Sequence, residues 1–463
     1  MNFKYRLQQI ILIAGDIIGI ALALFFSLAL RQLSLPNLDT VAAHLPLLGI
    51  LTVIWGASNY ASGLYDLGKL AASDRLRSLF QAAVLSLLTS VVAFYISGNT
   101  NVTPKTILIL SIILGYFWIG GWRALYTKLT AVTRLQTRII VVGSDSETLE
   151  LIDLIIKNPE KSYTVSALFD PTRKLRSNDF DGKIEVYSNV TALRAAITTH
   201  KAQMVVTGPG ISEDPEIVRE LYELLFWPVQ IKDFSSLYET ITGRVPPSSY
   251  SDSWLIANLV NYDHPLYESL RRLLDYVAGI GLGILCVILF PFIALAIRLN
   301  SPGPIIFTQV RVGWRGEHFF LNKFRTMQAL APDGSAEKAG AQFADPNDER
   351  VTKVGRFLRR TRLDELPQFW NLLRGDITLI GPRPERPEIV GKLESILPYY
   401  HLRLLVKPGI TGWAAIHQYY AGTLEEAITK LQYDLFYIKN RSIQLDIAIM
   451  LRTINVVVRM MGR

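Results

Sequence analysis

Four long apolar stretches within the first 130 residues constrain this chain more than any other feature of its sequence. They cover residues 10–30, 45–61, 79–97 and 106–122. A helix needs ~20 apolar residues to cross ~30 Å of hydrocarbon, and each stretch approaches that length. The first stretch exceeds the ~7 to 15 apolar residues of a signal peptide and three more follow it, which predicts a retained helix. The sequence therefore predicts a four-helix transmembrane region over residues 1–130.

Basic residues predict which side of the membrane each loop occupies. One set of predicted loops carries Lys4, Arg6, Lys69, Arg75, Arg77, Arg123, Lys128 and Arg134. The other set carries only Arg31 and Lys105. By the positive-inside rule, the N-terminus and everything after Trp122 are cytoplasmic. Asp16 lies inside the first stretch, and the sequence leaves open a functional intramembrane acid or an acid hydrogen-bonded between packed helices.

The rest of the chain is polar enough to form domains in water. Charged residues make up 19% of the whole chain, against roughly 25% in soluble proteins. Residues 1–130 hold only 13 of the 48 basic and 40 acidic side chains, so the charge is concentrated after them. The single cysteine, Cys286, excludes an intrachain disulfide and a cysteine-based zinc site. The net charge of +8 suits anionic lipids, nucleotides and nucleic acids equally well.

Residues 131–264 alternate between strand-like and helical patterns. The strand-like runs are 138–143, 164–170 and 202–210, and the helical patterns are 146–158 and 190–199. This alternation predicts a Rossmann-like α/β domain with a parallel sheet. A GxGxxG loop starting at Gly143 would need glycines where Asp145 and Thr148 stand, and a carboxylate there repels pyrophosphate. We therefore predict a domain without an intact dinucleotide loop and without functional NAD.

Residues 265–463 begin with a different kind of membrane segment. The apolar run over residues 276–297 is long enough to span a bilayer. Pro291 lies inside it, where a proline costs roughly 3 kcal/mol unless the helix bends. Basic residues flank the run at both ends, namely Arg271, Arg272 and Arg298, which predicts that both ends stay cytoplasmic. The sequence therefore predicts a re-entrant helix bent at Phe290 and Pro291.

Three basic segments that follow this helix predict phosphate binding. They are KFRTM at 323–327, the run 353–362, and GPRP at 381–384. The planar guanidinium of arginine binds phosphate oxygens in pairs, and such charge-assisted bonds are worth roughly 1.5 to 3 kcal/mol each. A nucleic-acid groove would interleave aromatic residues with the charges, but the run 353–362 contains only Phe357. The three segments favour a diphosphate ligand over nucleic acid.

Two adjacent acids, Asp364 and Glu365, lie between the second and third basic segments. Pro367 follows them, and because proline is well tolerated in the first turn of a helix, they are predicted at a helix start. The helix dipole and the arginines at 359, 360 and 362 predict an ionised Asp364 beside a bound phosphate. Alternatively, Thr361 and Asp364 match a capping box, and local spacing leaves both interpretations open.

Five motifs of the C-terminal region occur together in a known family. The chain has SPGPIIFTQVRVG at 301–313, KFRTM at 323–327, the LDELP and GPRP parts of 361–388, and VKPGITGW at 406–413. In these motifs it resembles the bacterial polyprenyl-phosphate hexose-1-phosphate transferases, also called monotopic phosphoglycosyl transferases. The four-helix region and the Rossmann-like domain are similar to those of the large members. These enzymes initiate exopolysaccharide, capsule or O-antigen synthesis in the bacterial inner membrane.

The resemblance implies a re-entrant-helix α/β catalytic domain on the cytoplasmic face and a two-step reaction. Asp364 would attack a UDP-sugar and release UMP, and undecaprenyl phosphate would then take the sugar phosphate from the aspartate. Glu365 would be the second acid, and Mg²⁺ would bind at both acids. The residues implied in substrate binding are Lys323, Arg325, Arg359, Pro382, Arg383 and Pro384, with Pro291 as the re-entrant break. The resemblance favours UDP-glucose, then UDP-galactose.

Two other functions are weighed against this one. A membrane scaffold or regulator could carry a vestigial catalytic domain, although retention of both acids and the arginines argues against it. A membrane-anchored nucleotide-sugar dehydratase needs a Tyr-x-x-x-Lys, and the chain has this pattern only at Tyr65 to Lys69, before any α/β domain. The apolar segment 443–459 predicts either an interfacial helix or a packed core helix with a basic end. The oligomeric state stays open, a homo-oligomer included.

Overall fold

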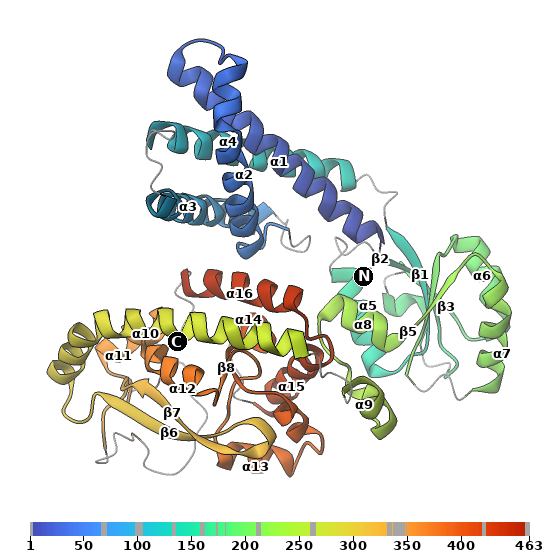
Figure 1. Ribbon diagram of the computed structural model, residues 1–463. Helices are drawn as coiled ribbons and strands as arrows, with labels where there is room; N and C mark the ends of the chain where they lie inside the picture. The colour runs from blue at the N-terminus through green and yellow to red at the C-terminus, as the bar shows by residue number, and fades with distance from the viewer. Residues whose placement is uncertain are drawn as a thin grey trace. The chain divides into compact units, whose positions relative to one another are not determined.

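The computed structural model of the chain forms two compact units, Met1–Thr242 and Gly243–Arg463 (Figure 1). The structure describes residues 3–65, 72–97, 105–131, 136–157, 163–172, 175–180, 182–209, 214–259, 265–330, 336, 348, 350–418 and 423–458. The first unit contains a helical region and an α/β sheet, each with its own hydrophobic core. The second unit contains the motifs that predict phosphate binding.

The helical region consists of α1 (Phe3–Gln32), α2 (Leu38–Ala61), α3 (Ala72–Ser97) and α4 (Lys105–Ala131). Three of these helices contain segments long and apolar enough to cross a membrane, namely Ile10–Gln32, Leu38–Ala61 and Thr106–Tyr126. Within the described part of α3, the apolar segment is shorter, Ser78–Ala93. The four helices bury a common core around Trp55. The number and order of the predicted helices are confirmed.

A chain of polar side chains connects the four helices through their core. Asp16 on α1 accepts from Arg123 on α4 at 2.8 Å and from Asn59 on α2 at 3.4 Å. The hydroxyl of Tyr116 donates to Asn59 at 2.9 Å and lies 2.7 Å from that of Ser86 on α3. Asp16 is thus hydrogen-bonded between packed helices. Arg123 is a fully buried core residue and not the loop residue that the sidedness prediction assumed. Lys69 and Arg134, also used there, lie outside the described residues.

The α/β part has five parallel strands in the order β3-β2-β1-β4-β5. Its strands are β1 (Thr137–Val142), β2 (Tyr163–Phe169), β3 (Glu185–Tyr187), β4 (Met204–Thr207) and β5 (Gln230–Asp233). Its helices are α5 (Ser146–Lys157), α6 (Leu193–His200), α7 (Pro215–Glu223) and α8 (Phe234–Thr242). Two hydrophobic clusters, one containing α5 and α8 and the other α6 and α7, cover opposite faces. This doubly wound arrangement confirms the predicted parallel sheet.

The second unit starts earlier than the predicted boundary between residues 264 and 265. Helix α9 (Asp252–Leu259) contributes Leu255 and Leu259 to a core shared with Leu431 and Leu435 of α15 (Leu424–Lys439). The backbone N–H of Val245 also donates to the carbonyl of Gln432 at 3.2 Å. Packing against α15, which lies far along the chain, joins residues 243–259 to the C-terminal unit. A local sequence pattern does not reveal such contacts.

The second unit is built around α10 (Pro265–Asn300) and two small sheets. The first sheet is an antiparallel hairpin of β6 (Ile306–Val312) and β7 (His318–Phe324), and the second pairs β8 (Thr378–Ile380) in parallel with β9 (Gly409–Thr411). The remaining helices are α11 (Lys353–Thr361), the 3₁₀ helix η9 (Leu363–Gln368), α12 (Phe369–Arg374), α13 (Pro387–Glu394), the 3₁₀ helix η10 (Tyr400–Leu405), α14 (Trp413–His417) and α16 (Ile443–Val458).

Helix α10 packs one face along its length against the rest of this unit (Figure 1). Near its start, Arg271 donates to the carbonyl of Ile380 and to the hydroxyl of Thr378. Near its end, Ile293 and Ile297 lie in a core with Phe324. The opposite side is a continuous row of exposed apolar residues that includes Val277, Ile284, Val287, Phe292 and Leu299. The helix continues through Pro291 without an interruption of helical structure.

The last helix, α16, packs against the rest of the unit, as in one of the two alternatives that its sequence left open. Asp446 and Ile449 are buried, and the carboxylate of Asp446 accepts from the hydroxyls of Tyr267 and Tyr437 at 2.8 and 2.9 Å. Ile447 and Ile454 are exposed on another face. The helix is therefore packed on one side and apolar on the other. The basic residues Arg459 and Arg463 lie outside the described part of the chain.

Candidate active site

The two acids, Asp364 and Glu365, lie at the start of η9, between α11 and α12. Arg362 connects α11 to η9 in a left-handed conformation, with φ of 59°, a conformation that residues other than glycine rarely adopt. Asp364 and Glu365 follow in the first turn of η9, as predicted for a helix start. The hydroxyl of Thr361 donates to carbonyls of Phe357 and Leu358 within α11, so the capping-box alternative is wrong.

Glu365 is the point on which three cationic side chains converge. Its Oε1 accepts from Arg383 at 2.8 Å, from Arg362 at 3.3 Å and from Lys323 at 3.4 Å. Burial alone would raise the pKa of Glu365, but these three cations outweigh it and hold that pKa far below its usual range. Burial also lowers the pKa of Lys323 to about 8, although Glu365 opposes that shift. Glu365 is therefore an ionised anchor for the cations.

Asp364 has a different environment from its neighbour. Its side chain is 7% exposed, and its buried Oδ1 has no hydrogen-bond partner among the described residues. Burial, and then the charge of Glu365, raise the pKa of Asp364 to about 6. The charges of Arg359 and Arg362 lower this pKa, as the sequence predicted for the arginines, but burial and the charge of Glu365 outweigh them. Asp364 is therefore a buried carboxylate, one oxygen of which has no hydrogen-bond partner among the described residues.

The predicted phosphate-binding residues divide into those near the acids and those elsewhere. Lys323, at the end of β7, and Arg383 contact Glu365 directly. Arg359 lies on α11, and its Nε donates to the hydroxyl of Thr326 at 2.9 Å. The positive charge of Arg359 lowers the pKa of Asp364, although burial and the charge of Glu365 raise it more strongly. Arg359 therefore acts on the site through its charge. These residues bring KFRTM, the run 353–362 and GPRP together around one acidic pair.

Arg325, which is also predicted to bind substrate, contacts the backbone at the end of α10. Its guanidinium donates to the carbonyl of Ser301 at 2.7 Å and to that of Pro302. These carbonyls follow the end of α10, where the last turn of a helix leaves acceptors unsatisfied. Gly303, with φ of 120°, lets the guanidinium approach, since a Cβ there would lie 2.3 Å from Nη1 of Arg325. The SPGP and KFRTM motifs are thus partners in ending α10.

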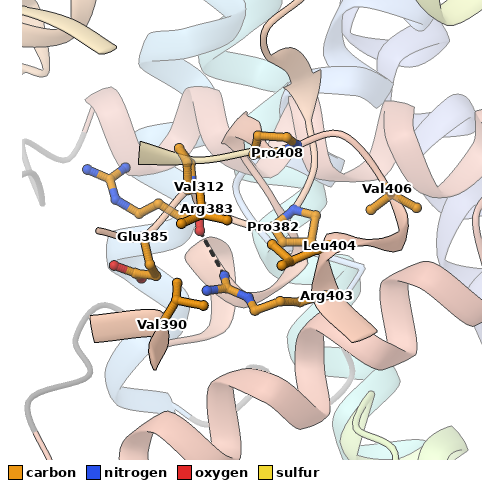
Figure 2. A pocket seen from close by; sticks show the side chains of 10 residues that line it. Val312, Pro382, Arg383, Glu385, Val390, Arg403, Leu404, Val406 and Pro408 are labelled. Atoms are coloured by element: carbon orange, nitrogen blue, oxygen red, sulfur yellow. Dashed lines mark hydrogen bonds between the residues drawn. The ribbon is translucent and has the colours of Figure 1, made fainter. Parts of the chain in front are cut away.

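The GPRP loop lies against VKPGITGW through close backbone contacts. A Cβ on Gly381 would lie 2.4 Å from the carbonyl oxygen of Lys407, and one on Gly412 would lie 2.2 Å from that of Gly381. Only glycine fits at these positions. Figure 2 shows a hollow beneath the loop between Pro382, Arg383 and Val406. Its volume of about 10 Å³ is far below the ~300 Å³ of a small-molecule pocket, so the prolines shape the loop and line no substrate site there.

Magnesium fits the acidic pair on chemical grounds. No cluster of three or more His, Cys, Asp or Glu residues that could hold a metal occurs among the described residues. Mg²⁺ at phosphoryl-transfer sites uses one or two carboxylates and completes its coordination with substrate phosphates and water. The unpartnered Oδ1 of Asp364 meets that need from the protein side. Glu365 is less available because three cations already contact its Oε1.

Comparisons with known proteins agree with this site. Residues 266–460 match the family described as "Bacterial sugar transferase". A putative undecaprenyl-phosphate N-acetylgalactosaminyl 1-phosphate transferase of Bacillus subtilis is 45% identical over 139 residues, which are 30% of this chain and 74% of that protein. The chain belongs to the bacterial sugar transferase family.

Two further relatives extend the match. A UDP-N-acetylgalactosamine-undecaprenyl-phosphate N-acetylgalactosaminephosphotransferase of Aeromonas hydrophila is 38% identical over 238 residues, 50% of this chain and 53% of that protein. A UDP-glucose:undecaprenyl-phosphate glucose-1-phosphate transferase of Escherichia coli is 42% identical over 199 residues, 42% of each chain. The chain thus spans about half the length of these two relatives.

A second family, described as "CoA-binding domain", matches residues 60–232, which include the α/β domain. The residues at its strand ends do not fit an anionic nucleotide. Asp145 caps the start of α5, accepting from the N–H of Thr148 at 2.9 Å and from its hydroxyl at 2.6 Å. Asp170, after the neighbouring strand, accepts from Ser144 at 2.5 Å and from the N–H of Leu175 at 2.8 Å. Carboxylates occupy the position where a pyrophosphate would bind.

Two arginines that contact the GPRP loop are not among the residues that the sequence predicted. Arg311 in QVRVG donates to the carbonyl of Pro384 at 3.1 Å, and Arg403 donates to the carbonyl of Arg383 at 2.8 Å. The position of Arg311 in a family motif was an available signal. Arg403 stands just before VKPGITGW, and nothing in its immediate sequence distinguishes it from a surface arginine.

Proposed function

We propose that this chain transfers a sugar 1-phosphate from a UDP-sugar to undecaprenyl phosphate through a phosphoryl-aspartate intermediate. The observation that supports it is the pairing of a buried, partly unpartnered Asp364 with a Glu365 that collects three cations. A nucleophile needs an available lone pair, and a diphosphate needs positive charge. Adjacent residues supply both at this site.

In the first step, an oxygen of Asp364 attacks the phosphorus that carries the sugar. A new P–O bond forms to the carboxylate, and the bond from that phosphorus to the bridging oxygen breaks, so UMP leaves with the electron pair. In the second step, a phosphate oxygen of undecaprenyl phosphate attacks the same phosphorus. The bond to Asp364 breaks, the carboxylate is restored and a lipid diphosphate sugar is released. Each step exchanges one P–O bond for another.

The remaining residues of the site orient and neutralise the diphosphate. The side chain of Arg383 is 39% exposed while one nitrogen contacts Glu365, so its other nitrogens can bind substrate phosphate. Lys323 and Arg359 add positive charge on the neighbouring elements. Asp364, with Glu365 as a weaker second ligand, would hold Mg²⁺, which when bound neutralises phosphate charge. A pKa near 6 leaves most Asp364 ionised at neutral pH, as attack requires.

The packing of α10 supports a re-entrant helix with both ends on the cytoplasmic face. Arg271 near its start contacts β8, and the side chain of Asn300 at its end accepts from the N–H of Val354 on α11. One polar domain therefore contacts both ends. A straight crossing would carry that domain through the bilayer, whereas a helix that enters and leaves on one side keeps it in water beside UDP-sugars. The positive-inside pattern supports a bacterial inner-membrane protein with this face inward.

We propose UDP-glucose as the first donor to test. The names of the relatives from Escherichia coli, Xanthomonas campestris, Klebsiella pneumoniae and Caulobacter vibrioides specify UDP-glucose. UDP-N-acetylgalactosamine is the second candidate, because the Aeromonas hydrophila relative that uses it in its name matches over 238 residues. UDP-galactose completes the panel. The product would initiate an exopolysaccharide, capsule or O-antigen repeat unit.

The deciding experiment measures UMP release by the full chain in nanodiscs. The protein is supplied with Mg²⁺, undecaprenyl phosphate and each UDP-sugar in turn. We expect UMP and lipid diphosphate sugar in equal amounts with one donor. A membrane scaffold would release no UMP from any donor, and a dehydratase would give a modified UDP-sugar without UMP. Either result would overturn the proposed function.

A further inference from the structure

Each carbonyl of the segment 382–385 accepts a hydrogen bond from a different residue. The N–H of Gly409 donates to Pro382 at 2.9 Å, and that of Val312 donates to Glu385 at 2.9 Å. The guanidinium of Arg311 donates to Pro384 at 3.1 Å, and that of Arg403 to Arg383 at 2.8 Å. The two prolines have no N–H with which to form local turn bonds. The shape of the loop therefore depends on donors from other elements.

Arg403 is the most buried of these donors. Its side chain is 3% exposed and pairs at 2.9 Å with Asp434 on α15, whose side chain is 2% exposed. The same guanidinium donates to the hydroxyl of Tyr400 at 2.7 Å. Figure 2 shows Arg403 beneath the loop, with its bond to the carbonyl of Arg383. Three partners fix this guanidinium in one orientation.

Helix α15 also contacts the 382–385 loop at a second point. Lys430, one turn before Asp434, contacts the carboxylate of Glu385, and Arg311 lies 3.7 Å from the same group. The loop is therefore fixed on the far side of the acids, while the side chain of Arg383 reaches forward to Oε1 of Glu365. Preorganised phosphate binding requires a loop backbone that is held in place and a cationic side chain, here that of Arg383, that already points toward the acids.

We propose that Arg403 and Asp434 form a positioning pair that holds Arg383 in place for the substrate diphosphate. This inference rests on the proposed function. The guanidinium of Arg403 acts through a backbone carbonyl and has no described contact with Asp364 or Glu365. Loss of a buried, charge-assisted hydrogen bond should let the loop shift, and Arg383 then binds the diphosphate less well. Because Arg383 would bind the donor before chemistry, the main effect falls on the KM for UDP-sugar.

The test variant replaces the pair by apolar residues, Arg403→Met with Asp434→Leu. Such a replacement of a buried ion pair is often neutral for stability, whereas removing one partner strands a buried charge. UMP release is measured against UDP-glucose, or the best donor of the panel, together with thermal unfolding. We expect a cooperative unfolding transition, which shows that the variant is folded, and a KM raised roughly 10- to 100-fold, with kcat less affected. Arg403→Lys, which keeps a cation beside Asp434, should give a smaller increase in KM.

A double-mutant cycle with Arg383→Gln separates positioning from a general structural role. If Arg403 acts through Arg383, replacing the pair in the Arg383→Gln background adds little further loss. The matched control is Arg441→Gln, since Arg441 is a largely buried arginine that pairs with Glu268 on α10. It should leave the KM unchanged.

Three results would overturn the inference. They are an unchanged KM in a folded pair variant, fully additive losses in the cycle, and an equal rise in KM for the Arg441 control. If the pair variant does not fold, Arg403→Lys in the same cycle decides the matter in the same way. Failure of the proposed function would look different, because wild-type protein would then release no UMP from any donor.

Discussion

The guanidinium of Arg383 donates a 2.8 Å hydrogen bond to Oε1 of Glu365. This contact joins the GPRP loop to the acidic pair and leaves the adjacent Asp364 with an unpartnered oxygen. The two acids therefore have separate tasks, one as an anchor for cations and the other as a reacting group.

Asp364→Asn should lose nearly all activity, because an amide is a poor nucleophile. Wild-type protein incubated with UDP-sugar and Mg²⁺, without lipid, should acquire one sugar phosphate per chain. Mass spectrometry should locate it on the peptide that contains Asp364, and the variant should acquire none. Normal lipid product without any trapped adduct or UMP exchange would instead indicate direct transfer between the two substrates.

Glu365→Gln should reduce kcat/KM by roughly 10² to 10⁴, the range for a group that assists charge development or proton transfer. The neutral amide no longer attracts Arg383, Arg362 and Lys323, so the cations lose their common partner. In contrast to Asp364→Asn, this variant keeps the nucleophile and should still form some adduct in long incubations. Complete absence of adduct in a folded Glu365→Gln protein would contradict the separation of roles.

Both ends of α10 should be labelled from the cytoplasmic side. Leu266 and Leu299 near its ends are exposed and suit replacement by cysteine in a Cys286→Ala background. Gly303 is unsuitable because a side chain there would collide with Arg325. A membrane-impermeant maleimide should react with both cysteines only in inverted vesicles. Labelling from opposite faces would make α10 a true span and would reject the re-entrant proposal.

The α/β domain should bind neither NAD nor CoA with any effect on turnover. Asp145 already caps the start of α5, and its negative charge repels a pyrophosphate. Asp145→Gly should not reduce UMP release, which does not depend on this cap. Calorimetry of the wild-type chain with either ligand should detect no binding, whereas stoichiometric nucleotide whose removal abolishes activity would refute this prediction.

The sequence predicted the architecture well where it depends on a run of apolar residues or on a motif within one segment. The apolar stretches gave the helices of residues 1–130, and the LDELP motif located both acids. The sequence did not predict contacts between distant residues. Arg325, Arg403 and Arg123 look alike in sequence, whether they bind a carbonyl, a carboxylate or a substrate phosphate. The raised pKa of Asp364 was missed because only the fold shows how deeply this carboxyl is buried.

Glu385 should make the chain more stable at neutral pH than in acid. Burial would raise its pKa, but Lys430, Arg403 and Arg311 outweigh burial and lower it to about 2 from an ordinary value of 4.5. A lowered pKa in the folded state stabilises the fold above about pH 4.5, and this contribution is lost as the pH falls toward 2. Glu385→Gln should therefore lower the thermal unfolding temperature at pH 7 and reduce the difference between pH 7 and pH 3.5. Glu388→Gln is a matched control, because Glu388 is exposed and pairs only with Arg386 among the described ion pairs. Equal effects of the two substitutions would show that Glu385 does not fasten the loop to α15.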